Sequence, residues 1–280
     1  MSAQAQVASF GVVGLGVMGS MLALNLAEKT GESIAGFELD PAKAKGAEAK
    51  ATKEGLGSAF KAYTDLKDFV NALTTPRRIV LLVPAGKPVD SALAALGPLL
   101  DKGDCVVDGG NEWYENTERR AAQFSALGLH YVGCGVSGGA EGARHGPSLM
   151  AGGPREAFDL LEPTLKKIAA QVDGPCLGYF GSGGAGDYQC NQNRKRDHPL
   201  QCEMETTRVD GVRRRKDALH TGNYVKMVHN GIEYGDMQLI GEAFLLLKNT
   251  QNGKGLARTT KDCARIFDKY NRGKLKSFLV

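Results

Sequence analysis

Short apolar runs rich in β-branched residues alternate with helical patterns through the first 185 residues of the chain. The runs predict strands over 10–13, 33–37, 79–83, 105–108 and 129–132. Between and after them, apolar residues recur at helical spacing and predict helices over 18–29, 41–51, 66–73, 89–100, 117–127 and 154–170. This alternation predicts a Rossmann-like, doubly wound α/β fold with a parallel sheet and right-handed crossovers.

The pattern breaks between residues 187 and 221. This segment has no clear period, and it holds eight basic and six acidic residues among few large apolar ones. Such a composition favours disorder, because little apolar surface is available to offset the entropy of ordering. Helical periodicity returns over 224–247, and Ile266, Phe267 and Tyr270 indicate a last helix. We therefore expect a dinucleotide-binding domain over 1–186, a disordered insertion over 187–221 and the start of an all-α domain over 222–280.

Composition narrows the functional classes. Apolar residues make up 42% of the 280 residues and the net charge is only +4, which argues against nucleic acid as a partner. No apolar run approaches the length of a membrane span, and the first 28 residues lack the basic residues of a targeting peptide. Six scattered cysteines indicate reduced thiols, so a cytoplasmic protein is expected, with no membrane partner and no metal.

A glycine-rich motif follows the first predicted strand and opens the first predicted helix, which is the context that a dinucleotide-binding turn requires. Its residues are Gly14, Leu15, Gly16, Val17, Met18 and Gly19. Gly14 permits a tight turn, Gly16 lets the backbone approach a pyrophosphate at the helix N-terminus, and Gly19 permits close packing of helix on strand. The alternative is a glycine-rich turn that binds no ligand.

An acid ends the second predicted strand. Glu38 lies 24 residues after Gly14, about where a carboxylate grips the ribose 2′-hydroxyl of NAD. An acid there repels the 2′-phosphate of NADP, so Glu38 by itself favours NAD. The alternative is that Glu38 is a solvated loop residue while Asp40 caps the helix that begins at Pro41.

Three further stretches combine glycine with polar side chains. Asp108-Gly109-Gly110-Asn111 directly follows a predicted strand, where open α/β sheets place ligands, and residues 135–148 contain Ser137-Gly138-Gly139. In the third stretch, Lys226, Asn230, Glu233 and Tyr234 are spaced to share one helix face, which would bring together a base, an amide, an acid and a phenol. The alternative is a solvated polar stripe.

These three stretches, with GLGVMG (14–19) and PRRIVLLVPAG (76–86), resemble 6-phosphogluconate dehydrogenase. VKMVHNGIEYGDMQLI (225–240) and GARHGPSLMAGG (142–153) carry most of the specificity. The resemblance implies oxidative decarboxylation of 6-phosphogluconate to ribulose 5-phosphate and CO2 in the pentose phosphate pathway, with reduction of NADP.

The resemblance also implies roles for individual residues. Lys226 would be the general base and Glu233 the acid that protonates C1 of the enediol. The substrate would contact Asn111, Ser137, Gly138, Gly139, His229, Asn230 and Tyr234, the last at the phosphate. The cofactor would contact residues 14–19, Glu38, Val83, Pro84, Ala85 and Asn111.

The chain departs from the family pattern at four places. Gly16 replaces a usual alanine, and Glu38-Leu39-Asp40 replaces the Asn-Arg-Thr of NADP enzymes, which leaves both NADP and NAD as candidate cofactors. Segment 187–221 interrupts the run from a Gly-Ala-Gly turn into the catalytic helix. We interpret it as a retained intron; the alternatives are a surface loop, a metal module whose Cys and His spacings fit no zinc pattern, and a basic arm.

The fourth departure is that the chain stops at Val280, while the family continues through a larger helical domain. That domain supplies phosphate-binding residues and most of a homodimer interface, so we expect weak or absent turnover from these 280 residues. The alternative functions are a related 3-hydroxyacid dehydrogenase and a non-catalytic NAD(P)-binding remnant.

Overall fold

A computed structural model describes residues 7–181, 221–251 and 258–273. The chain divides into two compact units, Met1–Lys226 and Met227–Val280, and each is described by itself. Of the expected insertion over 187–221, only Thr221 lies within the described residues, as the first residue of a helix.

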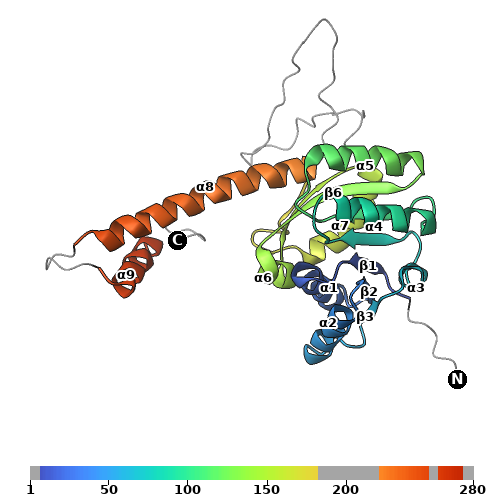
Figure 1. The fold of residues 1–280 in the computed structure, drawn as a ribbon, viewed down its shortest axis with the longest axis horizontal. Coiled ribbons are helices and arrows are strands. Elements are labelled where there is room, and N and C mark those ends of the chain that lie inside the picture. Colours follow the sequence, from blue (N-terminus) through green and yellow to red (C-terminus); the bar gives the residue numbers. More distant parts are fainter. Residues whose placement is uncertain (1–6, 182–220, 252–257, 274–280) are drawn as a thin grey trace, which may run out of the picture. The chain divides into compact units, whose positions relative to one another are not determined.

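The first unit is built on one eight-stranded sheet with the order β3-β2-β1-β4-β5-β6-β7-β8 (Figure 1). Its strands are β1 Phe10–Val13, β2 Ile34–Phe37, β3 Phe60–Tyr63, β4 Arg78–Leu81, β5 Cys105–Asp108, β6 His130–Ser137, β7 Ser148–Gly152 and β8 Leu177–Tyr179. The strand order runs outward in opposite directions from the neighbouring strands β1 and β4. In open α/β sheets, ligands bind beside such a switch point.

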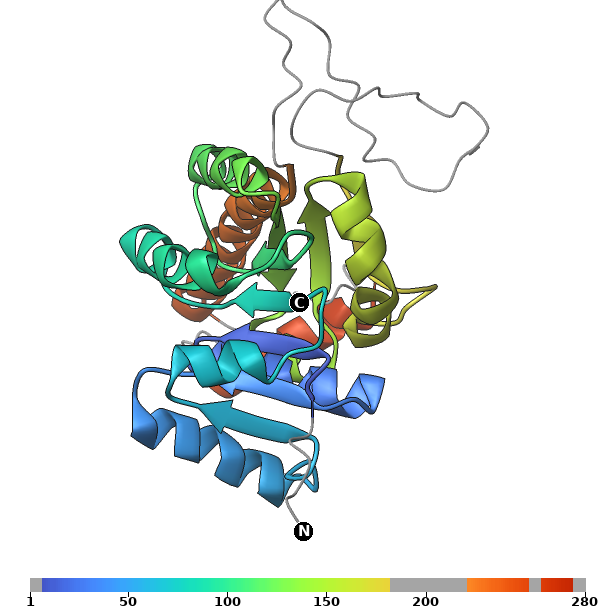
Figure 2. The same ribbon diagram turned by 90° about the vertical axis from the view of Figure 1, so that its right-hand side faces the viewer.

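Helices cover both faces of this sheet. They are α1 Val17–Thr30, α2 Pro41–Lys53, α3 Leu66–Asn71, α4 Lys87–Leu96, the 3-10 helix η1 Gly97–Leu99, α5 Tyr114–Ala126, α6 Gly139–His145 and α7 Arg155–Ile168. Buried residues of α1, α2 and α7 form one core with the sheet, and those of α3, α4 and α5 form a second. Figure 2 shows α4 and α5 on one side of the sheet and α7 on the other.

The second unit contains most of α8 (Thr221–Asn249) together with α9 (Thr260–Asn271). Helix α9 begins with a capping box, in which the Thr259 hydroxyl accepts the Asp262 N–H and the Asp262 carboxylate accepts the Thr259 N–H. The helical pattern expected around residues 224–247 and 266–270 is therefore confirmed.

The predicted Rossmann-like class is also confirmed, and the five predicted strands appear within a few residues of their expected places. The expected helix over 89–100 is wrong at its end, since α4 stops at Leu96 and η1 follows around Pro98. Pro98 has no N–H to donate to the Ala94 carbonyl, so the α-helical hydrogen bonding of α4 ends there.

One strand pair departs from the expectation of a parallel sheet. Strands β6 and β7 are antiparallel, with Ser137 opposite Ser148. Only ten residues, 138–147, join them, and a parallel crossover needs a dozen or more. The chain therefore turns back through α6, and β7 and β8, like β3 and α6, are elements that the sequence pattern did not reveal.

Candidate active site

The loop between β1 and α1 has a conformation that glycine permits. Gly14 has φ +90°, and a Cβ on it would lie 2.7 Å from the Leu82 carbonyl oxygen. A Cβ on Gly19 would overlap the Gly14 carbonyl oxygen. A larger residue at 19 would push α1 away from the end of β1, and a larger residue at 14 would collide with the backbone that follows β4, so these glycines permit the close packing around this loop.

The N-terminus of α1 is left open to solvent by this loop. The N-cap residue Gly16 has no side chain to accept a helix N–H, and the first turn holds no acid. Nothing lies within 4 Å of a Cβ placed on Gly16, and Val17 is 68% exposed. Unsatisfied N–H groups and the helix dipole attract an anion, so this end of α1 fits a pyrophosphate.

Glu38 lies against this same loop. Its carboxylate accepts the Leu15 N–H at 3.0 Å through Oε2 and the Asp40 N–H at 3.3 Å through Oε1. The side chain is half-buried, and it is held beside the glycine loop, unlike a free loop residue. The expected cap is confirmed as well, because Asp40 accepts the Ala42 N–H at 2.9 Å at the start of α2.

The loops after β4 and β5 meet the glycine loop at the same edge of the sheet. A Cβ on Gly14 would lie 3.0 Å from Val83, and one on Gly110 would lie 3.5 Å from the Val83 carbonyl oxygen. Pro84, Ala85 and Asn111 are exposed on these loops. The structure thus brings together the expected cofactor residues from β1, β4 and β5.

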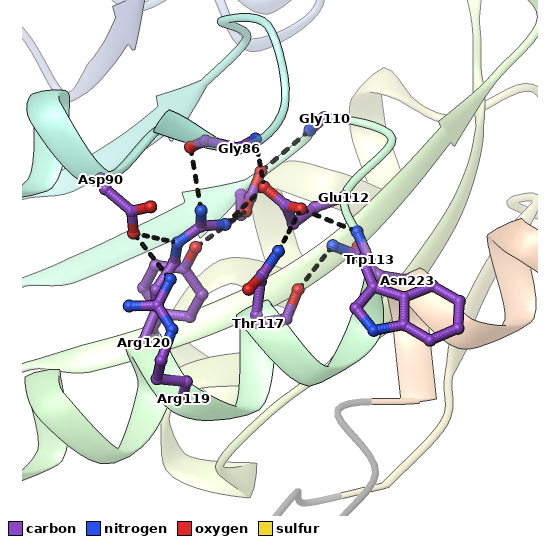
Figure 3. A network of polar contacts seen from close by, with 12 residues as sticks. Gly86, Asp90, Gly110, Glu112, Trp113, Thr117, Arg119, Arg120 and Asn223 are labelled. Atoms are coloured by element: carbon purple, nitrogen blue, oxygen red, sulfur yellow. Dashed lines mark hydrogen bonds and ion pairs between the residues drawn. The ribbon is translucent and has the colours of Figure 1, made fainter. Parts of the chain in front are cut away.

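A buried ionic network that sequence reasoning missed ties two of these loops to α5 (Figure 3). Arg120 is fully buried, and it donates to Glu112 Oε2 at 2.6 Å, to Asp90 Oδ1 at 2.8 Å and to the Gly86 carbonyl at 3.0 Å. Glu112 in turn accepts the Gly86 N–H at 2.8 Å and the Trp113 N–H at 2.8 Å. One guanidinium and one carboxylate therefore fix the loops that follow β4 and β5.

The network sets the charge state of its members. Burial by itself would raise the pKa of Glu112. The hydrogen bonds from Arg120, Gly86, Asn116 and Trp113 outweigh burial and lower this pKa to about 2. Hydrogen bonds from Arg120 and Arg119 lower the pKa of Asp90 to about 2. Both carboxylates are therefore ionised at neutral pH.

Asp108 ends β5 and begins the Asp-Gly-Gly-Asn turn. Burial raises the pKa of Asp108, although the Tyr131 hydroxyl donates to it at 2.8 Å and the Gly110 N–H at 3.1 Å. These bonds point the carboxylate into the sheet and fold the turn over it. Asp108 is thus a structural anchor, while Asn111 projects from the same turn at the surface.

Ser137, Gly138 and Gly139 lie where β6 passes into α6. Gly138 has φ +124° and caps α6, and Gly139 has φ +61°. Ser137 is half-buried, and both glycines are exposed. The expected Ser-Gly-Gly substrate turn therefore lies at the end of β6, which continues four residues beyond Gly133, the residue paired with the last residue of β5.

Lys226 is buried against β6 in the first unit. It is only 6% exposed, and a Cβ on Gly135 would lie 2.5 Å from the Lys226 Cβ. A Cβ on Gly222 would overlap the Gly133 carbonyl oxygen, so α8 begins in direct backbone contact with the strand. The Asn223 amide donates to the Thr117 hydroxyl at 2.9 Å and ties this first turn to α5.

The remaining expected site residues lie on α8 in the second unit. The His229 Nδ1 lies 3.2 Å from Asn230 Oδ1 and 3.6 Å from Glu233 Oε2, and Tyr234 is exposed. Lys226 and these residues belong to one continuous helix, as expected.

The described residues hold neither a metal-binding cluster nor a membrane-spanning helix. Within 7–181, 221–251 and 258–273, no group of three or more His, Cys, Asp or Glu residues could hold a metal ion. No helix in those ranges is long and apolar enough to cross a membrane.

Comparison with known proteins shows which family this chain resembles. A model described as the NAD binding domain of 6-phosphogluconate dehydrogenase matches residues 9–181. The chain belongs to the 6-phosphogluconate dehydrogenase family. The model of the C-terminal domain of 6-phosphogluconate dehydrogenase matches residues 222–280, so neither model covers 182–221.

Curated relatives of 6-phosphogluconate dehydrogenase match over nearly the whole chain. The chloroplastic decarboxylating 6-phosphogluconate dehydrogenase 2 of Spinacia oleracea is 45% identical over 96% of this chain and 42% of its own length. The decarboxylating enzyme of Klebsiella pneumoniae is 43% identical over 96% of this chain and 48% of its own. The chain thus spans about half the length of the curated relatives it matches.

Solved structures agree with these relatives. The 6-phosphogluconate dehydrogenase of Plasmodium falciparum, described in complex with its cofactor NADP+ and its substrate 6-phosphogluconate, superposes with a TM-score of 0.76. It is 34% identical and covers 97% of this chain and 49% of its own. A 3-hydroxyisobutyrate dehydrogenase of Salmonella typhimurium has a TM-score of 0.66 at 20% identity, over 97% of this chain and 75% of its own, which shows a shared fold alone.

Proposed function

We propose that this chain carries the dinucleotide site and the catalytic helix of a decarboxylating 6-phosphogluconate dehydrogenase. The observation that carries the proposal is the buried Lys226, packed against Gly135 of β6. Gly135 lies two residues before Ser137 and two residues beyond Gly133, which pairs with the last residue of β5. A buried amine at the carboxyl edge of a sheet, beside two polar glycine turns, fits a general base.

A nicotinamide dinucleotide, when bound, supplies the hydride acceptor. The open end of α1 would hold its pyrophosphate, and residues 83–85 and Asn111 would line its path along the sheet edge. NADP is the cofactor described for the Plasmodium relative, and family membership supports NADP as a cofactor that this chain can take.

The side chains of this chain would move the protons. Lys226 takes the proton of the substrate 3-hydroxyl as C3 loses its hydride, and C3 becomes a carbonyl. The C1 carboxylate then leaves as CO2, its bonding electrons pass into the C3 carbonyl, and protonated Lys226 returns its proton to that oxygen. Glu233 protonates the substrate C2, which becomes C1 of the product, the hydroxyl on C3 gives up its proton, and ribulose 5-phosphate results.

Substrate binding falls to the polar turns and to α8. We assign Asn111, Ser137 and the Gly138–Gly139 amides to the sugar hydroxyls and carboxylate, His229 and Asn230 to hydroxyls, and Tyr234 to the phosphate. Exposure of Asn111, Gly138, Gly139 and Tyr234 supports these assignments, since a substrate must reach each of them.

The domain boundaries belong to the same proposal. We propose a dinucleotide domain over 1–186, an insertion over 187–221 and the start of an all-α domain over 222–280. The gap between the two family models, from 182 to 221, supports an insertion foreign to the family.

A homodimer and a cytosolic location complete the proposal. The second unit exposes Ile232, Met237, Leu239 and Leu246 on α8, which supports burial of this helix in a protein interface. The described cysteines are free thiols, as expected of a reducing compartment, although some relatives are named chloroplastic.

A single-turnover assay tests the reaction. Excess chain is mixed with 6-phosphogluconate and either dinucleotide, and reduced nicotinamide is followed by absorbance together with released CO2. We expect Lys226→Met to lower the rate by at least about 1,000-fold, the scale for losing a general base, and Lys248→Met on the same helix to leave it unchanged. An active Lys226→Met would contradict the assignment of the base.

Two other outcomes would redirect the proposal. No cofactor reduction by the wild-type chain, with dinucleotide still bound, would overturn the activity and favour a non-catalytic NAD(P)-binding remnant. Oxidation of 3-hydroxyisobutyrate in preference to 6-phosphogluconate would favour the related 3-hydroxyacid dehydrogenases.

A further inference from the structure

We propose that Glu38 makes this chain bind NAD more tightly than NADP. This inference rests on the proposed function, because it concerns the dinucleotide at the open end of α1. The two cofactors differ only by a phosphate on the adenosine 2′-hydroxyl, so the residues that face that hydroxyl decide between them.

The Glu38 carboxylate is fixed where the adenosine ribose lies in Rossmann folds, after β2 and beside the glycine loop. The Leu15 N–H holds one carboxylate oxygen at 3.0 Å and the Asp40 N–H holds the other at 3.3 Å. Both bonds come from backbone, so the carboxylate keeps its place when no nucleotide is bound. It can accept the ribose hydroxyl proton, and it repels a phosphate at the same position.

The first two residues of α2 offer no N–H group to a 2′-phosphate. Asp40 already occupies the Ala42 N–H at 2.9 Å, and Pro41 has no N–H to donate. The capping carboxylate also adds a second negative charge two residues from Glu38. The helix end nearest the ribose therefore disfavours an anion, unlike the end of α1.

The residues of this turn fit an unmodified adenosine. Residues 38–42 contain two acids and no base, and the first base is Lys43. Leu39, between the two acids, is 81% exposed and offers an apolar surface to an adenine ring. A hydroxyl acceptor, an apolar contact and a negative field together select NAD.

The test compares NADH and NADPH binding to the full 280-residue chain. Each is titrated by nicotinamide fluorescence, with energy transfer from Trp113, the single tryptophan. We expect NADH to bind at least about 10-fold more tightly, the scale of one like-charge contact near a protein surface. As competitors, 5′-ADP should displace NADH more strongly than 2′,5′-ADP, which isolates the 2′-phosphate.

Variants assign the preference to one side chain. Glu38→Gln keeps an acceptor for the Leu15 N–H and removes the charge, and it should bring the two affinities within about 3-fold. Glu32→Gln makes the same change at the opposite end of β2, and it should leave the ratio unaltered. Thermal melts of each variant verify that the fold is kept.

The outcomes separate this inference from the proposed function. Tighter binding of NADPH, lost in Lys43→Ala, would overturn the inference, assign the 2′-phosphate to Lys43 and leave the dinucleotide site standing. A ratio unchanged in Glu38→Gln would likewise overturn the role of Glu38. Failure of the folded wild-type chain to bind either nucleotide would overturn both.

Discussion

The N-termini of α1 and α2 differ sharply, although each helix follows the carboxyl end of a parallel strand of the same sheet. The N-cap of helix α1 is Gly16, which has no side chain to cap the helix, and the first turn holds no acid. The N-cap of helix α2 is Asp40, whose carboxylate accepts the Ala42 N–H, and the helix begins at Pro41. The same helix dipole is thus left free in one case and neutralised in the other.

Helix α4 shows a third arrangement at the same edge. It also begins at a glycine, Gly86, but the Gly86 N–H is taken by Glu112 from the loop after β5. The Arg120 guanidinium balances the negative charge of that carboxylate, and the Arg120 side chain is itself shielded from solvent. Among these three helix ends, the N-terminus of α1 has no protein carboxylate and suits a ligand anion, whereas those of α2 and α4 are each closed by a protein carboxylate.

The largest loss of stability is expected at the N-terminus of α4, which Glu112 and Arg120 close. Arg120→Met should cost about 3–5 kcal/mol of unfolding free energy, because it leaves Glu112 and Asp108 as buried charges without their guanidinium. Urea denaturation measures the loss. Arg119→Met removes the exposed neighbouring guanidinium and should change stability by less than about 0.5 kcal/mol; equal losses in both variants would contradict the role of burial.

At the open end of α1, Gly19→Ala should cost about 3 kcal/mol, since its Cβ would overlap the Gly14 carbonyl oxygen. NADH binding should disappear with it, because the loop must move away from the strand. Gly16→Ala is the matched control: nothing lies within 4 Å of its Cβ, so stability should stay within about 0.5 kcal/mol. A Gly19→Ala protein that melts like wild type would refute the close packing.

Lowering the pH should reduce the free energy of unfolding, because Glu112, which closes the N-terminus of α4, becomes protonated. The pKa of Glu112 is lowered to about 2 in the folded chain, so its carboxylate stabilises the fold above the unfolded value near 4.5, and that contribution is lost as pH falls from about 4.5 to 2. The side chain of Glu112 is only 3% exposed, and the loss should reach about 2 kcal/mol. The pKa of Asp90 is also lowered in the folded chain, so Asp90 changes the stability in the same direction.

Asp108 acts in the opposite direction, because its pKa is raised and it binds a proton more readily when folded. Urea melts at pH 5 and pH 3 measure the net effect. Glu112→Gln should flatten this pH dependence. A slope identical to that of wild type would mean that Glu112 is not the group that titrates.

Capping α1 in the manner of α2 should weaken dinucleotide binding. Gly16→Asp places an acceptor at the N-cap and should stabilise the helix by about 0.5–1 kcal/mol. The same carboxylate competes with a pyrophosphate, so NADH binding should weaken by about 30-fold. Gly16→Asn caps without charge and separates the two effects; unchanged binding in Gly16→Asp would show that the pyrophosphate lies elsewhere.

The smallest effect on dinucleotide binding is expected from uncapping α2. Asp40→Ala removes the acceptor of the Ala42 N–H and should cost about 1 kcal/mol. It should also narrow the gap between NADH and NADPH without closing it, since Glu38 remains. Asp65→Ala, which uncaps α3, should cost a similar amount and leave the gap as it is.

Sequence alone determined the elements whose information is local. The β-branched runs at 10–13 and 105–108 became strands with these bounds, and the Gly14–Gly19 turn lies between strand and helix as its spacing required. The cap at Asp40 was readable as well, since a capping side chain bonds within its own turn. The motifs at 14–19 and 76–86, together with those from 108 to 240, sufficed to indicate the family.

Only the tertiary structure decided contacts between distant parts of the chain. Neither Glu112 nor Arg120 stands out in the sequence, because a surface helix also carries Glu and Arg; their burial follows from packing α5 against the loop at Gly86. The same holds for Lys226 on Gly135 and for the antiparallel β6–β7 pair.

Glu38 shows both kinds of information in one residue. Its position after β2 raised two interpretations, a ribose ligand or a solvated loop residue. The bond from Leu15, 23 residues away, then placed its carboxylate at the glycine loop. Local sequence specifies backbone conformation, whereas long-range packing determines which polar groups meet and which charges are buried.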